Sequence, residues 1–245
     1  FVHGVMNTDN MSIHGLTIDY GPYGWIEDFD PNWTPNTTDA NTLRYRFGHQ
    51  PRIVLWNIAR LLEAISPLVE NRSILQEKIN TAQDKMAHSH EKMWVNKLGL
   101  KQYDEELIQQ LVELMYHDKV DMTMFFRLLS SLSKPELHQL EPAFLDIHTA
   151  NQVDWKIWLK KYLEQTYDEH RAKMNLINPK YVLRNWMAQL AIDDAEKGDY
   201  AKIDLLANLL LNPYEEGYEF EKDWFRRRPE WALNRPGCSM LSCSS

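Results

Sequence analysis

Three oxygen-bearing side chains lie close together near the start of the sequence, in NTDNMSIHGLTIDYGP, residues 7–22. Asp9 and Asn10 precede a short apolar run, and Asp19 follows it. Carboxylate and amide oxygens are the ligands that a hard cation such as Mg²⁺ prefers. The same residue types also cap turns at the ends of hairpins, which is the structural alternative. If the run folds back on itself, the three side chains converge and can hold a cation.

The run between these residues has the pattern of a short hairpin. Apolar residues alternate with polar ones on both sides of His14-Gly15, a pair that favours a two-residue turn between four-residue strands. In that register Met11 pairs with Ile18, and Asn10 pairs with Asp19. Directly opposed residues have Cβ atoms about 4.5–5.5 Å apart. The pattern therefore predicts an amide and a carboxylate side by side at the open end of the hairpin.

Two further spacings resemble the catalytic segments of protein kinases. Asp19-Tyr20-Gly21 is similar to the metal-binding Asp-Phe-Gly, and His3 and Asn10 stand seven residues apart, like the His and metal-binding Asn of the kinase catalytic loop. The kinase catalytic base would stand two residues after His3, where this sequence has Val5. Valine cannot accept a proton, and the nearest carboxylate is Asp9. The spacing thus indicates a kinase-type site whose base has moved, or a site that performs a related but different transfer.

Three longer segments identify a family. FVHGVMNTDNMSIHGLTIDYGPYGWIEDFDP, RYRFGHQPRIVLWNIARL and NPKYVLRNWMAQLAIDDAEKGDY closely resemble the selenoprotein O family, and the resemblance is loosest between about residues 72 and 177. It implies a protein-kinase-like fold and an enzyme that transfers AMP from ATP to Ser, Thr or Tyr hydroxyls of proteins. Mg²⁺ or Mn²⁺ and ATP are the cofactors that it implies. A conventional protein kinase and a non-catalytic pseudokinase module that binds partners are the alternatives.

The resemblance also assigns roles to the three residues of the first paragraph. Asn10 and Asp19 match the family's metal ligands, with Asp19 also holding the nucleotide through the metal, and Asp9 matches the proposed catalytic base. The family's glycine-rich segment, its nucleotide-contacting Lys and the Glu that pairs with that Lys belong to an N-terminal lobe that precedes these motifs. Phe1 begins the sequence given, so we expect a fragment of a longer chain that is inactive by itself.

Composition limits the partners. The chain has 245 residues and a net charge of −8, which argues against nucleic-acid binding through a broad basic surface. No apolar run approaches the ~18 residues of a membrane span. The expected partners are protein substrates with hydroxyl side chains, with no nucleic acid and no membrane. The resemblance implies a protein of the bacterial cytoplasm, with mitochondria as the alternative.

The elements that must position the site are mainly helical. A long loop rich in Gly, Pro and Asn covers residues 21–51, and helical periodicity then predicts helices near 52–65, 72–97, 104–117, from Asp121, 154–174, from Pro179 to Gly198 and 205–211. We expect a helical C-terminal lobe of a kinase-like fold over residues 1–232, with a short N-terminal β-hairpin. Residues 233–245 are expected to form a flexible cysteine-bearing tail.

The two cysteines, Cys238 and Cys243, stand in that tail. The position of Cys243 matches a selenocysteine or cysteine of the family, which implies a redox role; an inert tail thiol is the alternative. In bacterial members that cysteine can pair with one in the loop after the metal site, where this sequence has Pro35. Cys238 is the remaining candidate partner. Two other groups have plainer explanations: His88 and His90 as surface residues, and Arg226-Arg227-Arg228 as an exposed charge run rather than a phosphate grip.

Overall fold

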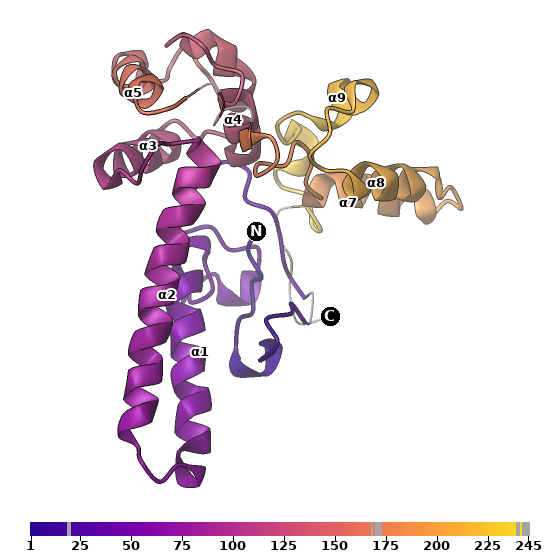
Figure 1. The fold of residues 1–245 in the computed structure, drawn as a ribbon. Helices are drawn as coiled ribbons and strands as arrows, with labels where there is room; N and C mark the ends of the chain where they lie inside the picture. Colours follow the sequence, from indigo (N-terminus) through magenta and orange to yellow (C-terminus); the bar gives the residue numbers. More distant parts are fainter. Residues whose placement is uncertain (19–20, 168, 170–172, 239–240, 242–245) are drawn as a thin grey trace. The chain divides into compact units, whose positions relative to one another are not determined.

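The structure is a computed structural model that describes residues 1–18, 21–167, 169, 173–238 and 241. Within these ranges the chain is mainly helical, as predicted, and its β structure is limited to isolated bridges (Figure 1). The two four-residue strands of the predicted hairpin are therefore not formed. None of the described helices is long and apolar enough to cross a membrane.

The chain divides into two compact units. The first comprises residues 1–24, 31–91 and 240–245, and the second comprises residues 25–30 and 92–239. The first unit contains the candidate site, the short helices η1 (Thr8–Asn10), η2 (Thr37–Asp39), η3 (Phe47–His49) and η4 (Ser66–Leu68), and helix α1 (Gln50–Ile65). Helix α2 (Ser73–Leu98) begins in the first unit and ends in the second.

The second unit holds the remaining helices. They are α3 (Glu105–His117), α4 (Met122–Leu129), η5 (Leu137–Ala143), α5 (Gln152–Glu164), α7 (Asn185–Ala195), α8 (Ala201–Leu211), α9 (Tyr218–Trp224) and η6 (Glu230–Ala232). Helix α3 packs on α5, α4 packs on η5, and α7 packs on α8. Two clusters of aromatic residues fill the core of this unit.

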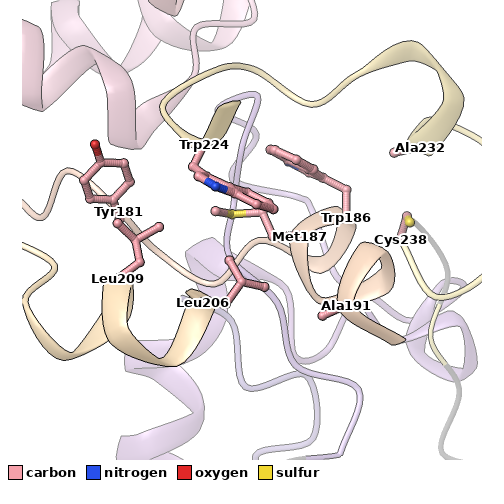
Figure 2. Packing of buried hydrophobic residues seen from close by; sticks show 9 residues of the cluster. All are labelled: Tyr181, Trp186, Met187, Ala191, Leu206, Leu209, Trp224, Ala232 and Cys238. Atoms are coloured by element: carbon pink, nitrogen blue, oxygen red, sulfur yellow. The ribbon is translucent and has the colours of Figure 1, made fainter. Parts of the chain in front are cut away.

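The first cluster surrounds Trp155 and Trp158 on α5, which are fully buried. The Trp158 ring stacks on that of Tyr162, with the ring centres 5.1 Å apart. The second cluster surrounds Trp186 on α7, whose ring stacks on that of Trp224 (Figure 2). Figure 2 also shows Cys238 at the edge of this cluster.

Side-chain caps explain several helix starts. Asp104 Oδ1 accepts a hydrogen bond from Leu107 N at 2.9 Å, and Asp121 Oδ1 accepts one from Met124 N at 3.0 Å. Each carboxylate satisfies a backbone N–H that has no partner inside its helix. Gly99, with a φ of 62°, takes the left-handed conformation directly after α2 ends.

Three predicted helices have wrong bounds, and the one expected at residues 205–211 begins at Ala201. The helix expected to run from Asp154 to about residue 174 begins at Gln152 and ends at Glu164. The helix expected to start at Pro179 begins only at Asn185, because residues 180–184 form hydrogen bonds elsewhere: Lys180 N and Tyr181 N both donate to Pro213 O.

Candidate active site

Asp9 and Asn10 lie next to each other on η1, a single turn of 3-10 helix. Asn10 N donates to Asn7 O at 3.3 Å and closes this turn. The Asp9 side chain is exposed, and its Oδ1 accepts a hydrogen bond from Thr8 Oγ1 at 3.1 Å. One carboxylate and one amide are thus presented together, with the carboxylate open to solvent.

The Asn10 amide is oriented by one hydrogen bond. Its Nδ2 donates to Val5 O at 2.9 Å, across the loop that carries Asp9. A cation binds the oxygen of an amide and never its NH₂ group, so this bond fixes the nitrogen and leaves Oδ1 for a ligand. Val5, which cannot itself accept a proton through its side chain, therefore contributes its backbone carbonyl to the candidate site.

His3 connects the loop to the segment that leads to Asp19. The ring is buried; Val5 N donates to its Nδ1 at 3.4 Å, and Nε2 lies 3.1 Å from Ile18 O. Because Ile18 O can only accept, Nε2 carries the proton. The neutral ring in this tautomer satisfies both partners, and Ile18 is thereby held beside the loop.

Gly4 allows the two segments to approach closely. Its φ is 83°, and a Cβ at this position would lie 2.3 Å from Pro22 O. The pair Val2 and Gly24 adds two backbone hydrogen bonds, of 2.8 and 2.9 Å. The described residues before and after positions 19–20 are thus both tied to the loop that carries Asp9 and Asn10. Asp19 and Tyr20 lie outside the described residues.

The register predicted for the hairpin is wrong by one residue. Met11 forms its bridge with Thr17, not with Ile18. The expected pairing of Asn10 with Asp19 lies outside the described residues. Gly15 N donates to Ser12 O at 3.0 Å, and Gly15 has a φ of 72°. These features are those of a three-residue loop, a type I turn followed by a left-handed glycine, rather than of a two-residue turn.

Three amide side chains from later in the chain hold the loop, and sequence reasoning missed all three. Gln50 Nε2 donates to Phe1 O at 2.9 Å and its Oε1 accepts from His3 N at 3.1 Å. Asn36 Nδ2 donates to Gly4 O at 3.2 Å. Asn57 Nδ2 donates to Met6 O at 2.9 Å and also contacts Met11 Sδ. Polar residues on a loop and on an amphipathic helix are indistinguishable from surface residues by pattern alone.

The donor set suits a hard cation in part. In the described ranges, no group of three or more His, Cys, Asp or Glu side chains could hold a metal ion. A site of Asn10, Asp19 and substrate phosphates would not form such a group, because one ligand is an amide and Asp19 lies outside those ranges. The oxygen chemistry of Asn10 and its fixed orientation fit Mg²⁺ or Mn²⁺.

A cavity of about 610 Å³ lies beside the loop. Thr8, Met11 and Ser12 line it on one side, and Asn57, Ile58 and Leu61 of α1 line it on the other. Ile13, Val54 and Ala64 add to its apolar lining, so the cavity can accept an apolar group directly next to the turn that carries Asp9 and Asn10.

Of the two candidate cysteines, only Cys238 is among the described residues. Cys238 is 4% exposed, and burial raises the pKa of its thiol, which lowers its reactivity as a thiolate. Cys243 lies outside the described residues. Leu241, two positions earlier, is held by backbone bonds: Leu241 N donates to Pro35 O at 3.2 Å, and Thr37 N donates to Leu241 O at 2.8 Å.

The run Arg226-Arg227-Arg228 is exposed, as the sequence suggests, only at Arg226; Arg227 and Arg228 are half-buried. Arg226 lies over the Trp186 ring, 5.3 Å from its centre. Arg227 donates to Ala143 O at 2.8 Å and pairs with Asp28, and Arg228 Nε lies 3.4 Å from a carboxylate oxygen of Glu27. All three arginines are occupied by contacts within the second unit. By contrast, His88 and His90 are exposed on α2, as predicted.

Comparison with known proteins identifies the family of this chain. A model of the family described as protein adenylyltransferase SelO matches residues 1–210. The chain is 49% identical to the protein nucleotidyltransferase YdiU of Flavobacterium johnsoniae over 262 residues. It is also 49% identical to the protein of the same name from Xanthomonas oryzae over 258 residues.

The chain belongs to the SelO family of protein adenylyltransferases. The resemblance drawn from the three motifs is thereby confirmed. In both comparisons the alignment covers 100% of this chain and 50% of the relative, so the chain spans about half the length of the curated relatives it matches. The matched range contains the whole candidate site, from His3 to Asp19.

Proposed function

We propose that the protein containing this chain transfers AMP from ATP to Ser, Thr or Tyr hydroxyls of other proteins, and that residues 1–24 supply the catalytic loop of a kinase-like C-terminal lobe. The observation that carries the proposal is the Asn10 amide, fixed by Val5 O beside an exposed Asp9, inside the range that matches the adenylyltransferase family. An amide oxygen and a carboxylate on one turn match the two roles that the reaction needs, a metal ligand and a proton acceptor.

Asp9 is the proposed base. The acceptor hydroxyl oxygen forms a bond to the α-phosphorus of ATP, the bond from that phosphorus to the bridging oxygen breaks, and pyrophosphate leaves. The hydroxyl proton passes to the Asp9 carboxylate, which is exposed and so within reach of a protein substrate. Asn10 Oδ1 and an Asp19 carboxylate oxygen would hold Mg²⁺ or Mn²⁺, which neutralises charge on the phosphates when bound.

This site needs more than the present chain provides. Nothing in the loop from His3 to Met11 is a lysine or an arginine, so no cationic side chain of this segment can grip the phosphates. The curated relatives are about twice as long as this chain. We propose that the additional half supplies the phosphate contacts. The chain alone should therefore be inactive, and the longer protein active.

Radiolabelled ATP tests the proposal. The protein that contains both halves, given ATP labelled at the α-phosphate, should label protein substrates and release pyrophosphate; Asp9→Asn and Asn10→Ala should each abolish the labelling. Label transferred from the γ-phosphate with release of ADP would show a conventional kinase instead. ATP binding without any transfer would leave the pseudokinase reading, and strong labelling by residues 1–245 alone would overturn the need for the second half.

A further inference from the structure

Asn57 contacts the loop that carries Asp9 and Asn10 on both sides of these two residues. It lies on α1, one turn after Ile53, and these are the buried residues of that helix. Its Nδ2 donates to Met6 O at 2.9 Å and contacts Met11 Sδ. Met6 and Met11 lie on either side of Asp9 and Asn10 in the sequence. One side chain therefore ties down both ends of the segment that carries the proposed base and the proposed metal ligand.

The orientation of the Asn57 amide follows from its partner. Met6 O is an acceptor, so only the NH₂ end of the amide can face it. Asn57 Oδ1 is buried and has no hydrogen-bond partner among the described residues. Buried polar groups are nearly always paired, and an unpaired one opposes folding. A leucine of similar size would remove the unpaired oxygen, but it would also remove the donor to Met6 O, so the asparagine serves the loop and not its own helix.

The other two amides act further from the chemistry. Gln50 bonds to Phe1 and His3, and Asn36 bonds to Gly4, all of which precede Asp9 by at least five positions. Asn57 holds residues that precede Asp9 by three positions and follow Asn10 by one. Loss of the Asn57 amide should move the Asp9 and Asn10 side chains without removing the contacts that Gln50 and Asn36 make with the loop.

We propose that Asn57 is a positioning residue for AMP transfer: through Met6 O and Met11 it sets the place of Asp9 and Asn10 on η1. The inference rests on the proposed function. A base or metal ligand displaced by about 1 Å can lower the rate by about 100-fold, so a residue without contact to the substrate can control turnover in this way.

The test uses the protein that contains both halves and compares Asn57→Asp and Asn57→Leu with wild type. The aspartate keeps the size but places oxygen against Met6 O, and the leucine keeps the size without a donor. Asp39→Asn is the control, because Asp39 is equally buried in the same unit and its carboxylate accepts hydrogen bonds from Thr42, Arg44 and Tyr45 of its own loop. All rates are corrected for the folded fraction measured by circular dichroism.

A positioning role predicts a kcat lower by about 10- to 100-fold in both Asn57 variants, with the KM for ATP within about twofold of wild type. The half-saturating Mg²⁺ concentration should rise, because Asn10 is displaced. Loss of folded protein lowers apparent kcat but leaves the metal dependence unchanged, so the Mg²⁺ titration separates the two causes. Asp39→Asn should keep the wild-type Mg²⁺ dependence. An Asn57 variant with wild-type kcat and Mg²⁺ dependence would overturn the inference.

Hydrogen exchange gives a readout that needs no activity. Peptides that cover residues 5–11 should exchange faster in Asn57→Asp than in wild type, and more so than in Asp39→Asn. If the wild-type protein transfers no AMP, the proposed function fails, and this comparison still decides whether Asn57 holds the loop. Equal exchange in the two variants would refute the positioning role, even with an active enzyme.

Discussion

Replacing Asp121 by alanine should cause the largest loss of stability of any single change discussed here. Asp121 is fully buried in the second unit and serves two partners. Its Oδ1 caps α4 through Met124 N at 3.0 Å and also accepts from Arg184 at 3.0 Å. Its Oδ2 accepts a second bond from the Arg184 guanidinium at 2.5 Å. Removal of this carboxylate leaves a buried guanidinium with less compensating charge.

The size of the effect can be worked out from these contacts. Loss of an N-cap costs about 1 kcal/mol. Breaking a buried ion pair by removing one partner costs about 3–5 kcal/mol. Glu27 remains 3.2 Å from Arg184, which favours the lower end of that range. The pKa of Glu27 is raised, chiefly by burial, so this second acid is itself held at an energetic disadvantage. We expect a total loss of about 4 kcal/mol.

The assay is urea unfolding followed by tryptophan fluorescence, because Trp155, Trp158 and Trp186 lie in the core of the same unit. Asp104→Ala is the matched control. Asp104 caps α3 through Leu107 N as Asp121 caps α4, but its side chain has no arginine partner among the described contacts. It should lose only about 1 kcal/mol. If the two variants unfold at the same urea concentration, the buried pair does not stabilise this unit.

Three further changes test other parts of the structure. Burial lowers the pKa of Lys97 to about 8, so between about pH 8 and 10.4 the unfolded chain binds more protons than the folded one. The stability of wild type relative to Lys97→Met should therefore rise with pH across that window in urea unfolding; a constant difference would contradict it. Gly4→Ala should destabilise the first unit more than Gly15→Ala, since both need a positive φ but only Gly4 faces a backbone oxygen at 2.3 Å; equal melting temperatures would refute this. Leu241→Pro removes the N–H that bonds Pro35 O and should increase hydrogen exchange at residues 36–39, whereas unchanged exchange would show that the bond is dispensable.

The parts of the fold that the sequence predicts correctly depend on local signals. Asp104 and Asp121 are caps because a carboxylate three residues before a backbone N–H can reach it whatever the rest of the chain does. Helix α2 ends at Leu98 because Gly99 takes a left-handed conformation at little steric cost. Trp155 and Trp158 are buried because large apolar rings on one helix face find a core.

The errors occur where distant partners decide the structure. The arginines at 226–228 look like a solvated run, yet Arg227 and Arg228 pair with Asp28 and Glu27, about 200 positions earlier. The helix expected at Pro179 starts later because Lys180 N and Tyr181 N bond to Pro213 O. No short window of sequence contains these partners, so no local pattern could have predicted them.

The register of the turn at His14-Gly15 could not be predicted from the sequence for a different reason. Glycine fits the second position of a two-residue turn and also the left-handed position that ends a three-residue loop. The sequence around His14-Gly15 permits both, and they differ by one residue in pairing. The structure adopts the second, with Met11 opposite Thr17. Local composition could not separate the two registers, because each places glycine where a positive φ is needed.

Some residues of the candidate site can be selected by their chemistry, and others can be found only from the fold. Asp9 and Asn10 could be selected from the sequence because few residue types bind a cation or accept a proton. Asn57 could not, because an amide that donates to a main-chain carbonyl has no distinctive chemistry of its own. Its part in the site follows from α1 lying against the loop, which brings residue 57 to residues 6 and 11. A search for the residues that control turnover in this family should therefore include buried amides whose only partners are the backbone next to the reacting groups.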